Sequence, residues 1–210
     1  VIVSILLNEI RSNAFRRISQ TLIYLPHFLS WIILAGIMID LLSPNGGLVN
    51  RFLGLFGAEP IFFLGSNKWF RFTLVFTDVW KEFGFGTIVY LAAITNIDPT
   101  QYEAATIDGA NRFQRIMHVT LPNMRMIIVL MMVLSLGNVL NAGFDQVYNM
   151  YSEAVYPTGD ILDTFIYRLS FKNGLWGQSA AVSMFKSVVS TLFISVSYLC
   201  AYKFADYRVF

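Results

Sequence analysis

Charged residues and cysteine are scarce in this sequence. Of its 210 residues, 13% are charged and one is a cysteine, Cys200. Ordinary soluble domains carry about 25% charged residues, so the composition excludes that class. A lone cysteine has no second thiol for a disulfide, which excludes a disulfide scaffold. Cys200 lies in an apolar run, where we expect it to act as a small apolar residue.

The chain also lacks a large excess of positive charge. The 15 Lys and Arg residues against 13 Asp and Glu give a formal net charge of +2, whereas nucleic-acid-binding domains carry a basic stripe or patch. We therefore predict no nucleic-acid partner. The sequence also offers no cluster of metal ligands and no pairing of a nucleophile with a base. We predict that the chain has no catalytic residues, binds no metal and is not an enzyme.

Apolar and aromatic side chains are abundant instead, at 56% and 16% of the chain. A membrane-spanning helix needs about 20 mostly apolar residues, and four stretches reach or approach that length. We predict an all-α integral membrane protein with a single transmembrane domain over residues 1–210. The predicted spans are residues 22–42, 72–97, 126–142 and 180–202. The apolar stub before Asn8 is too short to span, and we interpret it as the tail of a helix whose beginning is missing from this sequence.

The distribution of Lys and Arg between the connecting segments predicts the orientation. Cytoplasmic loops of membrane proteins are enriched in these residues. Given the four spans, eight of them lie on one side: Arg11, Arg16, Arg17, Arg112, Arg115, Arg125, Lys203 and Arg208. Five lie on the other side: Arg51, Lys68, Arg71, Arg168 and Lys172. We therefore expect the C-terminus and the loop at residues 98–124 to be cytoplasmic.

The loop at residues 98–124 has clear signals for helix boundaries. Asp98 is predicted to cap a helix that starts at the following proline, with Gln101 completing a capping box. Gly109 suits a left-handed residue that ends this helix. A second short helix is expected to follow, and Pro122 either ends it or marks the entry into the third span. The two helices can form a knob for a groove on another protein or a solvated connector, and the residue pattern alone leaves both open.

Seven positions of this loop have a recognisable spacing. They are Glu103, Ala104, Ala105, Gly109, Val119, Leu121 and Pro122. The pattern resembles the EAA signature of permease subunits of bacterial ABC importers, with Val119 in place of the usual isoleucine. The resemblance implies a helix bundle like the type I ABC importer transmembrane domain, in which this loop is a coupling helix. It also implies that Glu103 contacts a separate ATPase and that Gly109 bends the loop.

The same resemblance implies the partners of the chain. They are cytoplasmic ABC ATPase subunits, a second permease subunit in a homo- or heterodimer, an extracytoplasmic substrate-binding protein and membrane lipid. The sequence has no G-x-x-x-x-G-K-[ST] phosphate loop, so we expect no cofactor on this chain and ATP use by the ATPase. The implied location is the bacterial plasma membrane, crossed several times.

Three further sequence segments resemble those of the carbohydrate-uptake permeases, most closely the lipoprotein-dependent polysaccharide or oligosaccharide permeases. They are YLPHFLSW at residues 24–31, DVWKEFG at 78–84, and GN followed by NAGFDQ within 137–146. This resemblance implies that the chain forms the translocation path for a carbohydrate, most simply an oligosaccharide.

Several polar residues inside the predicted spans are candidates for that path. A charged side chain at mid-bilayer costs about 2.5 to 3.5 kcal/mol, so charges there should face protein or water. The candidates are Asp78, Trp80, Lys81, Glu82, Asn138, Asn141 and Lys186. Their polar groups can bind sugar hydroxyls, and the indole ring can stack on an apolar sugar face. Alternatively, the charges pair internally and only hold helices together.

A secondary, ion-coupled transporter is the rival function. It would use the intramembrane cluster of Asp78, Lys81 and Glu82. Such carriers often contain inverted repeats, and we find no convincing internal repeat here. The rival also leaves the EAA pattern unexplained.

Overall fold

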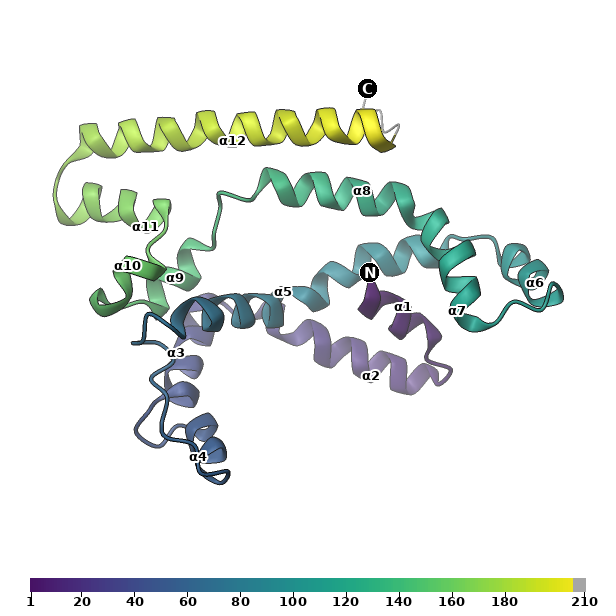
Figure 1. Cartoon of the computed structure of the whole chain (residues 1–210), viewed down its shortest axis with the longest axis horizontal. Helices are drawn as coiled ribbons and strands as arrows, with labels where there is room; N and C mark the ends of the chain where they lie inside the picture. Colours follow the sequence, from purple (N-terminus) through teal and green to yellow (C-terminus); the bar gives the residue numbers. More distant parts are fainter. Residues whose placement is uncertain (206–210) are drawn as a thin grey trace. The chain divides into compact units, whose positions relative to one another are not determined.

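All regular secondary structure in the part of the chain that the structure describes, residues 1–205, is helical (Figure 1). The structure is a computed structural model. The chain divides into two compact units: unit 1 comprises Val1–Pro26, Glu82–Asn138 and Thr191–Phe210, and unit 2 comprises His27–Lys81 and Val139–Ser190. The side chains of Cys200 and Lys203, together with Arg208, lie outside what the structure describes, so the predictions made for them stay predictions.

Unit 1 contains the N-terminal helices and the predicted loop. Its elements are α1 (Ile2–Glu9), α2 (Asn13–Tyr24), α6 (Pro99–Ile107), α7 (Arg112–Arg115), the π-helical turn η2 (Ile116–Thr120) and α8 (Leu121–Gly137). Its core is Ile94, Ile97 and Met124, with Val119 packed against them. Apolar residues from the end of one long helix and the start of another therefore hold this unit together.

Unit 2 contains shorter helices. They are α3 (Trp31–Leu42), α4 (Leu48–Gly54), α9 (Phe144–Met150), η3 (Glu153–Val155), α10 (Tyr156–Gly159), α11 (Leu162–Tyr167) and the π-helical turn η4 (Arg168–Lys172). The core is built from Ala35, Leu64, Phe70, Met150 and Val155. Two helices, α5 (Phe70–Thr95) and α12 (Trp176–Ala205), run through both units.

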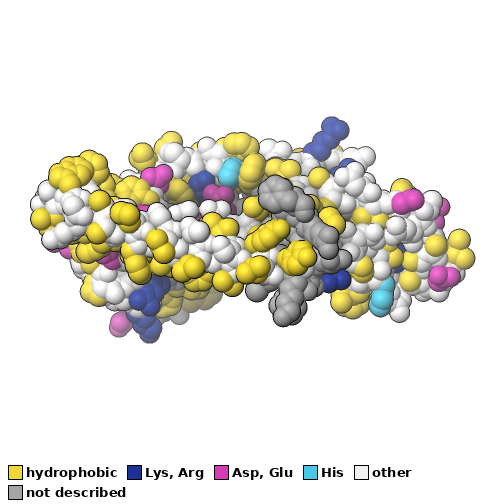
Figure 2. All heavy atoms as spheres, turned by 90° about the horizontal axis from the view of Figure 1, so that it is seen from above, with side chains coloured by type: hydrophobic (Ala, Val, Ile, Leu, Met, Phe, Trp, Pro, Cys, Tyr) yellow, Lys and Arg dark blue, Asp and Glu magenta, His cyan; other side chains and the backbone are white. Residues whose placement is uncertain are grey.

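Apolar side chains cover much of the molecular surface, as Figure 2 shows in yellow for one face. Within the residues that the structure describes, two helices are long and apolar enough to cross a membrane, Arg112–Leu136 and Trp176–Leu199. The pair Asn13–Phe28 and Trp31–Leu42 passes the same test only when taken together. Large exposed apolar surface needs a lipid or protein cover. The predicted span at 72–97 is the helix α5, whose charges at Asp78, Lys81 and Glu82 keep it out of this set.

The predicted span at residues 22–42 is not one continuous helix. Helix α2 ends at Tyr24, and the 3₁₀ turn η1 (Leu25–Phe28) follows before α3 starts. Pro26 has no backbone N–H and disfavours a helical conformation for the residue before it. Ser30 then caps α3 by accepting a hydrogen bond from the N–H of Ile33 at 3.4 Å. The break therefore follows from the local sequence.

Of the two outcomes predicted for Pro122, the structure shows entry into the third span rather than the end of the short helix. Helix continues from Arg112 to Leu136, with Pro122 in the first turn of α8 directly after η2. The ring of a proline crowds the carbonyl four residues earlier in an α-helix, and the wider hydrogen-bond spacing of a π-turn relieves that crowding. Helix α8 ends at Gly137, five residues before the approximate limit predicted for this span.

Candidate functional site

The start of the loop is fixed by Asp98. Its Oδ1 accepts a hydrogen bond from the N–H of Thr100 at 2.9 Å, and this bond holds the pKa of Asp98 below its ordinary value. The predicted capping box with Gln101 is wrong. The Oε1 of Gln101 instead accepts a hydrogen bond of 2.8 Å from Asn123, which also donates to the carbonyl of Val119 at 2.8 Å. Gln101 thus joins α6 to the start of α8 rather than capping α6.

The turn after α6 depends on Gly109, as predicted. Its φ of +78° lies in the left-handed region that glycine adopts without strain. The next residues start α7 with a capping box: Asn111 accepts from the N–H of Gln114 at 2.9 Å, and the Gln114 side chain accepts from the N–H of Asn111 at 2.8 Å. The sequence therefore encodes a sharp turn between α6 and α7.

Further contacts attach α6 to the helix that follows the turn. The hydroxyl groups of Tyr102 and Thr120 are 3.0 Å apart, and Arg115 donates to Thr106 at 3.1 Å. Val119 packs on the buried core of unit 1. Packing and hydrogen bonds therefore hold α6 against the helix that follows the turn.

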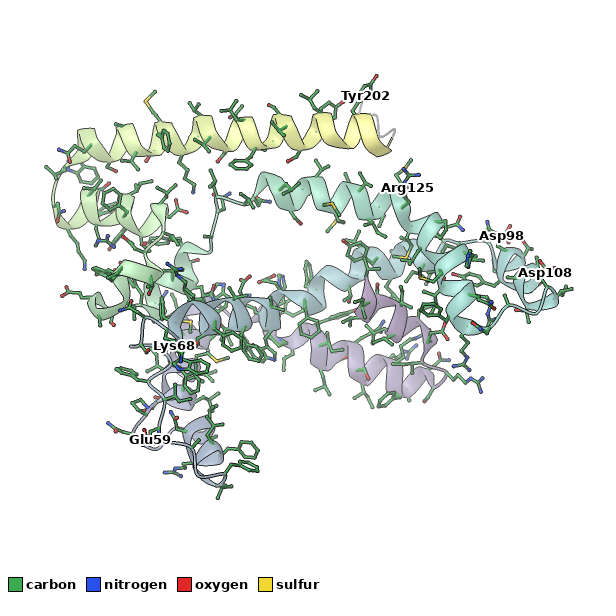
Figure 3. All side chains as sticks on the ribbon, in the orientation of Figure 1. Glu59, Lys68, Asp98, Asp108, Arg125 and Tyr202 are labelled. Atoms are coloured by element: carbon green, nitrogen blue, oxygen red, sulfur yellow. The ribbon has the colours of Figure 1, made fainter. Side chains whose placement is uncertain are left out.

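The other face of the loop is open. Glu103 and Ala104 are exposed, and two large apolar side chains nearby, Ile107 and Phe113, are 86% and 70% exposed. Figure 3 shows Asp98 and Asp108 near the two ends of α6. A hollow of about 370 Å³ beside the turn is lined by Ala105, Asp108, Gly109, Ala110, Gln114 and Arg115 among others. Exposed apolar residues around a polar hollow are typical of a surface that binds another protein.

The candidate substrate-path residues on α5 lie in different environments. Lys81 is buried, and its Nζ donates to the carbonyl oxygen of His27 at 2.9 Å and lies 5.6 Å from the ring centre of Trp31. Trp80 lines a hollow of about 560 Å³ whose other walls are mostly apolar, such as Leu34 and Phe76. Asp78 belongs to unit 2 with Lys81, whereas Glu82 and Asn138 belong to unit 1.

Lys186 and Asn141 lie together at a second hollow, of about 460 Å³, in unit 2. The Nζ of Lys186 donates to both carboxylate oxygens of Asp163, at 2.6 and 2.8 Å. Asn141 is in the connector between α8 and α9 rather than in a span. No pattern in the sequence pairs Asp163 with Lys186, because Asp163 lies in the connecting segment between the predicted spans 126–142 and 180–202.

Gln146 has a structural role that the sequence patterns did not indicate. Its side chain is buried and its Nε2 donates to the carbonyl of Leu74 and to the hydroxyl of Thr77, both at 2.8 Å. These bonds join α9 to α5 within unit 2. A buried amide needs such partners, because an unpaired polar group would cost about 1 to 3 kcal/mol.

A cluster of charged and aromatic residues forms between α10 and η4. Asp160 accepts hydrogen bonds from Arg168, one of them at 2.8 Å, and from Thr164 at 2.6 Å. The guanidinium of Arg168 also lies 4.4 Å from the ring centre of Tyr156. Burial alone would raise the pKa of Asp160, but the hydrogen bonds from Arg168 and Thr164 and the charge of Arg168 lower it below its ordinary value.

Acidification is expected to remove the stabilisation that this cluster supplies. The pKa of Asp160 in the folded protein is lower than the value of about 3.9 in an unfolded chain. Its stabilisation is therefore complete above pH about 4 and is lost as the pH falls toward the folded-state pKa. We expect Asp160→Asn to lower the Tm of the protein in detergent at neutral pH and to weaken the fall in Tm below pH about 4. Asp145→Asn, at an exposed acid of α9, is the control, and identical pH profiles for both variants would contradict this role.

Comparison with known proteins identifies the family. The family model described as "Binding-protein-dependent transport system inner membrane component" matches residues 1–209. The chain therefore belongs to this family of membrane transport permeases. This confirms the resemblance that the loop indicated.

Individual relatives agree with this assignment. The chain is 39% identical over its whole length to the polygalacturonan/rhamnogalacturonan transport system permease protein YteP of Bacillus subtilis (strain 168). It is 40% identical over its whole length to protein LplB of the same organism. It spans 65% and 66% of the lengths of these two relatives, so about two thirds of each is represented.

A solved structure confirms the predicted importer-permease fold. The crystal structure of a bacterial ABC transporter involved in the import of the acidic polysaccharide alginate matches with a TM-score of 0.94 and 36% identity. The match covers 97% of this chain and 71% of that one. A second crystal structure, of the alginate ABC transporter in complex with an alginate pentasaccharide-bound periplasmic protein, matches with a TM-score of 0.93.

Proposed function

We propose that the chain is the membrane-spanning permease subunit of an ABC importer for oligosaccharides. The family match over residues 1–209 is the observation that carries this proposal. The names of the similar permeases and of the alginate importer support a carbohydrate substrate. The candidate spans support a path through the membrane.

Coupling to ATP hydrolysis is proposed to occur through the loop. Glu103 and Ala104, with the exposed side chains of Ile107 and Phe113, form the surface that a cytoplasmic ATPase would cover. Hydrogen bonds from the loop to the start of α8, such as Gln101 with Asn123, support the transfer of motion from this surface to a membrane helix. ATP itself would be bound and hydrolysed by the ATPase.

The remaining partners follow from the same proposal. A second permease subunit would complete the path, and an extracytoplasmic binding protein would deliver the substrate, as the periplasmic protein in the similar alginate complex suggests. The positive charges of the loop support a cytoplasmic position for it and for the C-terminus in the plasma membrane.

Uptake of labelled oligosaccharides into proteoliposomes tests the proposal. The liposomes hold the full-length subunit with its second permease subunit, ATPase and binding protein. We expect uptake to require ATP and Glu103→Ala to reduce it about 10- to 100-fold, the equivalent of one lost hydrogen bond to a charged group. Glu59→Ala, at an exposed acid in unit 2, is the matched control and should retain wild-type uptake.

The same assay distinguishes the rival function. Uptake that needs an ion gradient but no ATP would overturn the proposal in favour of an ion-coupled carrier. Equal uptake by Glu103→Ala and Glu59→Ala would leave import by the complex standing but would contradict coupling through Glu103.

A further inference from the structure

Helices α11 and α12 form a hairpin with an internal row of polar side chains. Gly174, at φ +67°, makes the turn, and the N–H of Leu175 donates to the carbonyl of Leu169 at 2.8 Å. On this hairpin the hydroxyls of Ser170 and Ser179 are hydrogen-bonded. Further from the turn, Asp163 and Lys186 lie almost the same number of residues before and after Gly174 and pair with each other. The hairpin therefore brings together polar groups that are distant in the sequence.

A lysine at the position of Lys186 costs free energy unless its charge is paired or hydrated. It lies within the candidate span Trp176–Leu199. Ten residues separate it from Trp176, where α12 starts, or about 15 Å along the helix axis. The side chains of Lys186 and Asp163 are 15% and 25% exposed, so neither is freely hydrated. Ionisable residues inside spans are rare and mark substrate or ion pathways.

The hollow beside this pair is lined with groups that bind hydroxyls. It contains the side chains of Asn141, Asp163, Lys186, Ser183, Ser187 and Ser190, and its volume of about 460 Å³ lies in the usual range for ligand pockets. The serines recur at the spacing that places them on one face of α12. Ser183 and Ser187 donate to the carbonyls four residues earlier, at 2.9 and 3.0 Å.

We propose that this hollow is a sugar-binding subsite, in which the Lys186–Asp163 pair and the serine face of α12 bind ring hydroxyls of the oligosaccharide. This inference rests on the proposed function. A hydroxyl both donates and accepts, so it matches a site that offers an ammonium, a carboxylate and several hydroxyl oxygens side by side. The pair carries no net charge, so the subsite binds neutral and acidic sugar units alike.

Two serines of α12 provide a matched test. Ser187 lines the hollow, whereas Ser195 does not, and both are exposed and donate to the carbonyl four residues earlier, at 3.0 and 2.8 Å. We expect Ser187→Ala to raise the KM of ATP-driven uptake about 3- to 10-fold, the effect of one lost hydrogen bond. Ser195→Ala should keep the wild-type KM.

A double variant separates binding from the purely structural role of the ion pair. Replacing a buried pair with apolar residues of similar size often preserves folding, so Lys186→Met with Asp163→Leu should assemble normally. We expect it to raise the KM more than 10-fold. A normally assembled double variant with wild-type KM would show that the pair only holds the hairpin together and would overturn the inference.

The assay is run on every neutral and uronic-acid oligosaccharide that the wild-type complex imports. Similar losses of affinity for both kinds support binding through hydroxyls, whereas a loss confined to the acidic sugars would overturn it in favour of carboxylate binding by Lys186. Equal KM values for Ser187→Ala and Ser195→Ala would overturn the subsite and leave the proposed function intact. Absence of ATP-driven uptake by the wild type would instead overturn the proposed function, and the subsite with it.

Discussion

Replacing Gly84 with alanine is expected to destabilise unit 1 by about 1 to 3 kcal/mol, the usual cost of an overpacked contact. Gly84 is buried in α5, and a Cβ atom there would lie 2.1 Å from the carbonyl oxygen of Ile23 in α2. A backbone oxygen cannot rotate away as a flexible side chain can, so the helices must separate. We expect a lower Tm for the purified protein in detergent.

Gly86 provides the control in the same helix. Nothing lies within 4 Å of a Cβ built at this position, so alanine fits without a clash. Since alanine favours helix over glycine by up to about 1 kcal/mol, Gly86→Ala should leave the Tm unchanged or raise it. Equal losses of Tm for Gly84→Ala and Gly86→Ala would show that the close approach of α2 and α5 does not hold in the folded protein.

Replacing Gly109 with arginine is expected to abolish association with the ATPase while the chain still inserts into the membrane. The left-handed φ of +78° costs a non-glycine residue about 1 to 2 kcal/mol, which the rest of the fold can bear. No atom lies within 4 Å of a Cβ at this position, so a long side chain would project away from the helices, at the edge of the loop hollow. There it would occupy the surface that we propose the ATPase covers.

Co-purification of the complex from membranes measures this effect. Gly109→Asn is the control, because asparagine tolerates the left-handed conformation and has a short, uncharged side chain. We expect Gly109→Asn to retain the ATPase and Gly109→Arg to lose it, with equal amounts of both permease variants in the membrane. Normal recovery of the ATPase with Gly109→Arg would contradict the coupling role of the loop.

The loop shows how far local sequence rules extend. The cap at Asp98 and the turn at Gly109 were predicted correctly, because each depends on the backbone preferences of one or two neighbouring residues. Gln101 was predicted wrongly because its side chain has a competing partner, Asn123, that is 22 residues away in the sequence. Rules based on neighbouring residues do not include a hydrogen-bond partner that is so far away in the sequence.

The helix boundaries show the same limit. Charge and hydropathy located α12 and α5 within a few residues, since a long apolar run has no alternative to helix in a membrane. They did not locate the break at η1, and at Pro122 they left open whether the helix ends or continues into the next span. Pro26 follows the end of α2, whereas Pro122 lies in a helix that continues because the π-turn η2 accommodates its ring. The packing around each proline decides between the two outcomes.

The sequence by itself determined the class of this protein. Its low charge, its apolar runs and the spaced residues from Glu103 to Pro122 define a membrane permease, because each is a property of composition or of near neighbours. Only the tertiary structure decided which polar groups meet. The pairing of Asp163 with Lys186 and the exposure of Phe113 depend on how helices pack. Contacts between side chains depend on their distance in space, and this distance cannot be read from the linear sequence.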